Sequence, residues 1–164
     1  ELGVNLYRVD YKDLVDFDPI AFTNVNRSKV RAEGAELTLS IGLADTIMVN
    51  TSLTYNDTRV IGEDAELRRR PDWKGSIRGD WQYSQDLGFF SQVNYTGEYY
   101  DSSVPTGVVK MPDYINVDAG ASWTVDENIV IGGQIQNIFD DDYEESIGFP
   151  NPGRIFSMRI NATF

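Results

Sequence analysis

Residues 114–125 read YINVDAGASWTV, and every second side chain in this stretch is apolar or small. From Ile115 to Val125 the odd-numbered positions hold isoleucine, valine, alanine and tryptophan. The even-numbered positions between them hold asparagine, aspartate, glycine, serine and threonine. A period of two residues is that of a β-strand with one apolar and one polar face. Strands of soluble proteins average about five to six residues, so this stretch predicts an unusually long strand.

The same alternation recurs along the chain and predicts seven further long strands. They cover about 3–15, 23–42, 46–57, 72–83, 88–100, 129–137 and 156–164. Tilted strands of about 9–11 residues have the length that crosses a bilayer. Within the second stretch, Val30 and Ala32 have the opposite parity to Leu37 and Leu39. This change of parity predicts a bulge or twist near Gly34.

The predicted connections alternate in length along the chain. Short turns fall at 43–46, 84–87 and 126–128, and long polar loops at about 14–23, 57–71, 100–113 and 138–153. Short turns at one end and long loops at the other are typical of outer-membrane barrels, with the short turns in the periplasm. The aromatic residues gather at two heights, near the short turns and near the long loops, as interfacial girdles do.

These patterns together predict an all-β fold, an antiparallel transmembrane β-barrel with eight strands present, in the cell outer membrane. A soluble β-sandwich has the same alternation along each strand, but it gives no reason for the unequal loops. The eighth strand ends on Phe164. Counting from the loops, this residue is expected at the periplasmic rim.

Charge and composition narrow the classes of function. The chain has 26 acidic and 14 basic residues and a net charge of −12, so nucleic acid is a poor partner. It has no cysteine or histidine, which removes disulfides, thiolate metal sites and the usual acid–base residue. No nucleophile elbow, P-loop or dinucleotide fingerprint occurs, and the acidic run 140–142 lacks the spacing of a calcium loop. We predict no enzyme, no cofactor and no metal site.

The C-terminal stretch 137–164 carries a resemblance to a known family. It reads NIFDDDYEESIGFPNPGRIFSMRINATF and resembles the last hairpin of TonB-dependent outer-membrane receptors. The residues that carry the resemblance occur in the family's order: Asn137, Ile138, Phe139, Asp140, Tyr143, Gly148, Phe149, Pro150, Pro152, Gly153, Arg154 and Phe164. Residues 24–37, with Asn26, Gly34 and Glu36, are similar to another strand of the family, and 68–77 look like its Arg-x-Pro strand start. The Gly-Phe-Pro-x-Pro-Gly-Arg form is most similar to cobalamin receptors and to colicin I-type siderophore receptors.

The resemblance implies a position in a larger barrel and a function for the chain. Residues 1–164 would be the C-terminal third of the barrel, the last eight strands of a 22-strand cylinder, with no plug domain among them. The expected function is TonB-dependent transport of a metal chelate, an iron siderophore or cobalamin, across the outer membrane. The partners implied are outer-membrane lipid, the rest of the barrel, the plug, TonB acting through the plug, and the barrel-assembly machinery. The alternative is a self-contained eight-stranded barrel with a structural or adhesion role; a soluble β-domain enzyme is a third.

Three groups of residues are candidates for the site. Arg68, Arg69 and Arg70 form the one basic cluster, which either grips phosphate, lipopolysaccharide or an anionic chelate or is an ordinary loop base. Tyr99 and Tyr100 either touch a flat ligand at the rim or belong to the girdle. Arg78, Asp80, Asp118 and Arg159 either face the plug or line a solvated inner wall. By resemblance, the closing strand is the assembly signal, through Phe156, Met158, Ile160 and Phe164.

Overall fold

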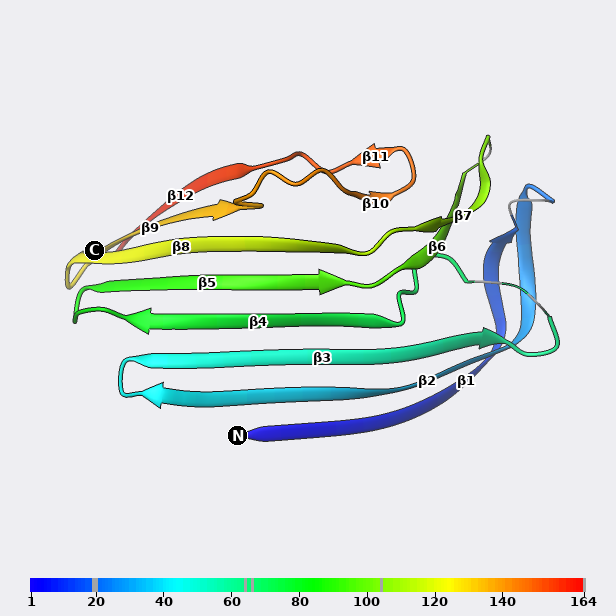
Figure 1. Cartoon of the computed structure of the whole chain (residues 1–164), viewed down its shortest axis with the longest axis horizontal. Helices are drawn as coiled ribbons and strands as arrows, with labels where there is room; N and C mark the ends of the chain where they lie inside the picture. The colour runs from blue at the N-terminus through cyan, green and yellow to red at the C-terminus, as the bar shows by residue number, and fades with distance from the viewer. Residues whose placement is uncertain (19–20, 64, 66, 104, 164) are drawn as a thin grey trace.

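The computed structural model describes residues 1–18, 21–63, 65, 67–103 and 105–163. Within these residues eight long strands form one antiparallel sheet, in which each strand pairs with the next (Figure 1). The strands are β1 (Leu2–Asp18), β2 (Thr23–Ala44), β3 (Ile47–Val60), β4 (Trp73–Gln82), β5 (Leu87–Thr96), β8 (Tyr114–Asp126), β9 (Ile129–Gln136) and β12 (Ile155–Ala162). The all-β architecture and its eight antiparallel strands are confirmed. Phe164 lies outside the described residues.

The described residues contain no helix, and so none that is long and apolar enough to cross a membrane.

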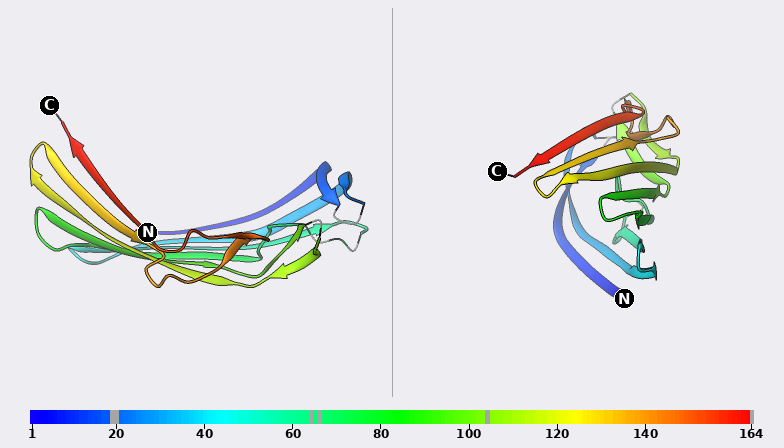
Figure 2. Two further views of the ribbon diagram at one scale, coloured as in Figure 1. Left: turned by 90° about the horizontal axis from the view of Figure 1, so that it is seen from above. Right: turned by 90° about the vertical axis from the view of Figure 1, so that its left-hand side faces the viewer.

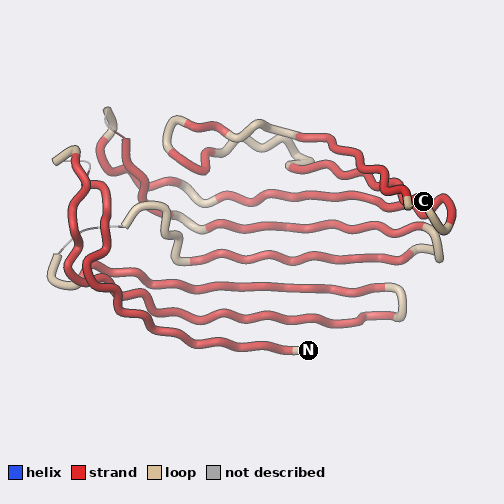
Figure 3. Tube along the Cα trace, turned by 180° about the vertical axis from the view of Figure 1, so that it is seen from behind, coloured by secondary structure: helices blue, strands red, loops and turns tan. Residues whose placement is uncertain are grey.

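All three short turns lie at one end of the sheet, and the longer connections lie at the other (Figure 3). Three of the predicted long polar loops at the latter end contain strands in the structure. β1 and β2 continue through most of 14–23, and 100–113 contains a hairpin of β6 (Tyr99–Ser103) and β7 (Gly107–Met111). A further small hairpin, β10 (Glu144–Ser146) with β11 (Phe149–Pro150), precedes β12. Neither short hairpin has the long apolar alternation on which the sequence prediction rested.

The predicted strand at 88–100 is divided in two in the structure. β5 ends at Thr96, and Tyr99 begins β6, which belongs to a separate sheet. Between them the amide of Gly97 donates to the carbonyl of Trp73 at 2.8 Å. A side chain at residue 97 would meet that carbonyl oxygen at 3.1 Å. The chain therefore leaves the main sheet at a glycine held against β4.

The sheet is one layer thick and strongly curved (Figure 2). The strand register places the alternate residues of neighbouring strands in common rows, such as Thr51–Ile77–Val93–Val117 on one face. Large apolar side chains on this face are open, with Ile77 54% and Met158 72% exposed. Such a surface is unfavourable in water and is what a barrel presents to lipid. We call it the outer face.

The outer face carries aromatic side chains at both ends of the strands. Near the short turns Trp81 contacts Tyr83 and Phe89, with ring centroids 5.2 and 5.7 Å apart. Near the long loops Tyr55 and Trp73 are 4.8 Å apart. The apolar rows lie between these two groups. The arrangement matches that of interfacial aromatic residues in membrane barrels.

A bulge or a twist was predicted near Gly34, and the bulge is absent, because β1, β2 and β3 keep one register through Tyr7, Gly34 and Asn56. The irregularities of the β2–β3 and β8–β9 pairs lie at the short turns instead. Gly34 has another role: a side chain there would lie 2.1 Å from the carbonyl oxygen of Tyr55 and 2.7 Å from the hydroxyl of Tyr7. The ring of Tyr7 covers this glycine.

The change of parity in β2 reflects a change of surroundings. Toward the long loops, Val30, Val60 and Leu67 form a buried cluster with Leu14 and Ala65 packed against it. Val30 is 1% exposed and points to the face opposite that of Leu37, since the register between them is unbroken. In β2, apolar side chains therefore point outward in the half near the short turns and inward in the half near the long loops.

Candidate functional site

The polar face of the sheet is the concave one, and Arg78 stands near its centre. Its Nε lies 3.0 Å from both carboxylate oxygens of Asp80, and its guanidinium lies 4.0 Å from the ring centroid of Phe90. One hollow is shared by Arg78 on β4 and Arg159 on β12. Side chains four strands apart can line one hollow only if the sheet curls toward this face. Two of the predicted inner-wall charges are therefore brought together, and Arg78 is already paired with a third.

Asp118 occupies the same face but serves the chain itself. Its Oδ1 accepts a hydrogen bond from the amide of Asn137 at 3.0 Å, and its Oδ2 lies 3.5 Å from Nδ2 of Asn94. The end of β9 is thereby tied to β8 from the inside. The carboxylate holds the start of the segment that carries the family resemblance.

That segment is a tightly bonded turn. Asn137 is 3% exposed and left-handed, with φ 49°, and its side chain exchanges hydrogen bonds with the backbone of Asp141 at 2.9 and 3.0 Å. Asp140, also left-handed at φ 61°, accepts from the amide of Arg154 at 2.7 Å. A side chain on Gly153, whose φ is 72°, would approach the Asp140 carboxylate to 3.0 Å. Asp140, through its side chain, and Asp141, through its backbone, therefore stabilise this turn. No group of three potential metal-ligating side chains occurs in the part of the chain described.

The remaining motif residues lie between this turn and the closing strand. Tyr143 stacks on Tyr114 with centroids 4.2 Å apart and accepts a hydrogen bond from Asn116 at 3.0 Å. Gly148, with φ 78°, forms the turn of the β10–β11 hairpin. Phe139 is 68% exposed, and Pro152 precedes the left-handed Gly153.

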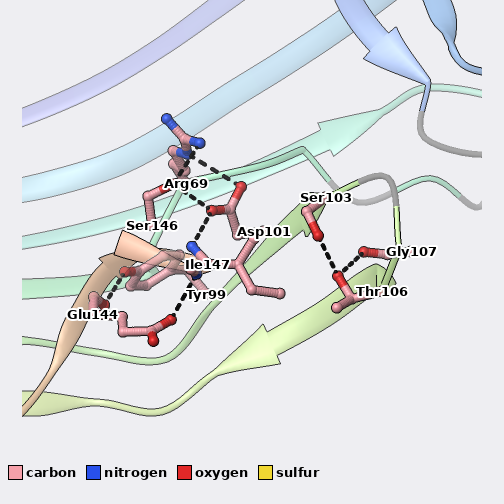
Figure 4. A network of polar contacts seen from close by, with 10 residues as sticks. Arg69, Tyr99, Asp101, Ser103, Thr106, Gly107, Glu144, Ser146 and Ile147 are labelled. Carbon is pink, nitrogen blue, oxygen red and sulfur yellow. Dashed lines mark hydrogen bonds and ion pairs between the residues drawn. The ribbon is translucent and has the colours of Figure 1, made fainter. Parts of the chain in front are cut away.

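At the long-loop end, Asp101 joins three connections in one network of polar contacts (Figure 4). The side chain of Asp101 on β6 is fully buried and accepts from Nε of Arg69 at 3.1 Å. Its other oxygen accepts from Oγ of Ser146 at 3.1 Å and from the amide of Ile147 at 3.0 Å. Arg69 also donates to Ser146 at 2.7 Å. We call these four residues the loop clamp.

Opposing effects act on the Asp101 carboxyl, and ionisation is favoured. Burial raises its pKa, but hydrogen bonds from the amides of Ile147 and Ser102 and from Arg69 and Ser146 bring the pKa below its ordinary value. A buried carboxylate that accepts several hydrogen bonds stays charged. The clamp is therefore an ionic one at neutral pH.

The two predicted rim tyrosines lie beside the clamp. Tyr99 is 5% exposed, and its hydroxyl donates to the carbonyl of Glu144 at 3.1 Å; burial raises its pKa. The carbonyl of Tyr100 accepts from the amide of Arg69 at 2.7 Å. Tyr99 thus packs between connections, and its ring is largely covered by protein.

Arg68 and Arg70 point to different places. The guanidinium of Arg68 lies 5.1 Å from the ring centroid of Phe17. Arg70 lines a cavity of about 290 Å³ on the inner side of β1–β3, next to the buried cluster. The other lining residues are Tyr7, Val9, Tyr11, Leu14, Val30, Ala32, Asn56, Thr58 and Leu67. We call this the rim cavity.

The rim cavity was not predicted from the sequence. Tyr7 and Tyr11 have the alternation of any strand, and only their pairing with Gly34 and Val30 places them on the inner face. The hydroxyl of Tyr7 donates to the side chain of Asn56 at 2.8 Å. Two tyrosines, an arginine and an amide around one hollow can bind a flat, anionic molecule through stacking and charge-assisted hydrogen bonds.

Comparison with known proteins supplies the family. The family model described as TonB dependent receptor-like, beta-barrel matches residues 1–138. This chain belongs to the TonB-dependent receptors. As a receptor barrel segment it is an outer-membrane protein, which confirms the predicted location and family.

Solved receptor structures share the fold of this segment. The ferric-catecholate import receptor Fiu of E. coli K12 matches with a TM-score of 0.80 at 22% identity, over 99% of this chain and 25% of that one. The ferric enterobactin receptor PfeA of Pseudomonas aeruginosa, as a G324V mutant, matches with a TM-score of 0.77 at 19% identity, over 99% and 29%. The siderophore receptor PiuA of Acinetobacter baumannii gives 0.76 at 18%, over 98% and 26%. The chain thus spans about a quarter of the length of these receptor structures.

Proposed function

We propose that the protein imports an iron siderophore across the outer membrane, and that this chain is the C-terminal segment of its barrel. The rim cavity carries the proposal, because it sets Tyr7, Tyr11 and Arg70 around a hollow that opens on the concave side. Ferric catecholate complexes are anionic and expose aromatic rings, which suits tyrosine rings and a guanidinium. The structural neighbours support the same ligand class, since they are a ferric-catecholate import receptor, a ferric enterobactin receptor and a siderophore receptor.

We further propose that the segment is one arc of a larger cylinder. β1 and β12 stand at opposite ends of the sheet order and do not pair with each other in the described residues. An open strand edge in lipid leaves backbone groups unsatisfied, so both edges are expected to pair with further strands of the receptor. This arrangement favours the larger barrel over a self-contained eight-stranded one with a structural or adhesion role.

The inner wall and the closing strand have their own roles in this proposal. Arg78, Asp80 and Arg159 would face a plug domain, on which TonB would act to drive transport. Phe156, Met158 and Ile160 share the outer face of β12, with 69%, 72% and 59% of their surface exposed, and together with Phe164 would be read by the barrel-assembly machinery. No chemical step is required of any residue, so the proposed protein is not an enzyme.

The test is uptake of iron-55 by cells that carry the receptor as their sole siderophore importer. Arg70→Ala with Tyr11→Ala should lower uptake of one class of ferric siderophore while the amount of folded receptor stays constant. Labelled cobalamin serves as the second substrate, because the C-terminal motif also resembles cobalamin receptors. Uptake of cobalamin without any ferric chelate would replace the siderophore by cobalamin, and uptake of neither would refute import by this receptor.

A further inference from the structure

A patch of charge lies on the outer face of β1–β3, just beyond the apolar band toward the long loops. It contains five basic and three acidic residues in a chain whose net charge is −12. Its members are Arg8, Asp10, Lys12, Lys29, Arg31, Glu33, Asp57 and Arg59. We call it the outer charged patch.

The strand register fixes the side on which the patch lies. Val30 and Ala32 point inward to the buried cluster and the rim cavity, so Lys29, Arg31 and Glu33 beside them point outward. Lys12 pairs with Lys29 and shares its face.

The outer face is apolar on the side of this patch that lies toward the short turns. There β1 presents Leu2, Val4 and Leu6, which are 65%, 64% and 76% exposed, and β3 presents Tyr55 beside Trp73 of β4. An apolar surface followed by an aromatic pair and then by charge is the order of chemistry across one leaflet of a bilayer. The outer charged patch is therefore at the height of lipid head groups.

The pairing within the patch puts like charges directly opposite each other. Lys12 faces Lys29 across β1 and β2, and Arg31 faces Arg59 across β2 and β3. Like charges in directly opposed cross-strand positions destabilise a sheet. Arg31 is relieved by Asp10, at 2.8 Å, and Arg59 by Asp57 on its own strand.

The two lysines have less relief, since the charge of Lys29 acts on the Asp10 carboxylate only at a distance. Neither side chain forms an ion pair or a hydrogen bond with any residue that the structure describes. On the same face, the Asp10 carboxylate already accepts from Arg31 and lies 3.9 Å from Nε of Arg8. An anion from outside the protein would turn this repulsion into attraction.

We propose that the outer charged patch binds the phosphate groups of an anionic lipid in the leaflet that surrounds the long-loop end. The ammonium groups of Lys12 and Lys29 hold the phosphate through charge-assisted hydrogen bonds, and the acyl chains of the same lipid lie along Leu2, Val4 and Leu6. This site is separate from the rim cavity, which lies on the opposite face of the same strands, and its function does not depend on the ligand that is transported.

The decisive experiment measures thermal unfolding of the purified receptor in two kinds of vesicle. One is made of phosphatidylcholine alone, and the other contains added lipid A, whose sugar phosphates are anionic. In phosphatidylcholine, K12Q/K29Q should melt at the wild-type temperature or slightly higher, because the repulsion is removed. In lipid A vesicles the wild type should gain stability and K12Q/K29Q should not.

Lipid affinity gives the size of the effect. Each lysine near an anionic surface contributes about a fivefold factor, so K12Q/K29Q should bind lipid A at least about tenfold more weakly. K12R/K29R should retain binding and shows that the positions tolerate substitution. K74Q is the matched control, since Lys74 lies on the inner face of β4, and it should bind lipid A as the wild type does.

Three outcomes would overturn the proposal. The first is that K12Q/K29Q does not differ from the wild type in lipid A, and the second is that K74Q loses as much affinity. The third is that inorganic phosphate added in zwitterionic detergent raises the wild-type melting temperature as much as lipid A does, which would assign a small-anion site instead. None of these outcomes bears on iron uptake, so failure here and failure of the proposed transport are distinguishable.

Discussion

The membrane wall and the loop end of this segment are built on different principles. Among the described residues, the side chains buried from solvent are found at the loop end, including Val30, Tyr99, Asp101 and Asn137. In the wall, large apolar side chains such as Ile77 and Met158 are more than half exposed. The wall therefore depends on lipid and on its backbone hydrogen bonds, whereas the loop end has a small core of its own. A single strand such as β2 can therefore face lipid along one part of its length and pack against protein along the other.

The largest expected effect comes from placing a charge on the lipid side of the wall. Ile77→Arg should destabilise the folded receptor in vesicles by about 2–4 kcal/mol, because a cation near the bilayer midplane loses its hydration. Ser76→Arg, one residue away on the inner face, should change stability little. Urea unfolding in vesicles checks both, and equal losses would show that the two faces do not differ as the comparison requires.

The next effect should be confined to the loop end. Asp101→Ala removes the acceptor of the clamp and leaves the buried amide of Ile147 unpaired, which costs about 2–3 kcal/mol. The three connections should then exchange amide hydrogens faster, while β4, β5 and β8 keep their protection. Hydrogen exchange with mass spectrometry measures this. Faster exchange throughout the wall would mean that the two regions unfold together.

A smaller effect distinguishes the inner cluster from the outer face. Val30→Ala should cost about 1–2 kcal/mol, because Val30 is only 1% exposed and the lost methyl groups would leave a cavity. Val4→Ala is the matched change on the lipid side, where Val4 is 64% exposed and acyl chains can fill the space. Unfolding in vesicles compares the two. A larger loss at residue 4 would reverse the assignment of faces.

The smallest effect is a dependence on pH at the clamp. Because the folded pKa of Asp101 is lowered, its contribution is fully present above the pKa of an unfolded aspartate, about 3.9, and is lost as the pH falls through the folded value. Proteolysis of the loops should therefore accelerate only at acidic pH. Asp101→Asn, which cannot titrate, should show no such acceleration; if it does, another group is responsible.

The strands and their faces were predictable because they follow from local periodicity. The stretch 114–125 became β8, one residue longer, since each alternate side chain meets lipid or water directly. The hairpin of β6 and β7 was missed, because its strands lack a lipid-facing side and so lack the alternation. A bulge or twist was predicted near Gly34 from the change of parity at Val30, but that change reflects the buried cluster on the inner face and not a change of register.

The sequence identified the candidate site residues by their chemical type, but only the fold showed which residues each of them contacts. The three arginines are consecutive in the sequence, but they lie in different surroundings. Arg68 contacts Phe17, Arg69 binds Asp101, and Arg70 lines the rim cavity. Tyr7 and Tyr11 were not distinguishable from ordinary strand tyrosines. Contacts such as that between Arg69 and Ser146 span 77 residues, and no local pattern encodes them.

The sequence by itself determined that long strands alternate, that their connections alternate in length, and that the chain closes on the motif of a receptor barrel. These properties are set by each side chain's preference for lipid or water, which acts residue by residue. Only the tertiary structure decided that the apolar side of β2 near Val30 faces inward, that Lys12 faces Lys29, and that Asp101 joins three connections. Those features depend on register and on loops folding back, so they arise from the packing of distant segments against each other.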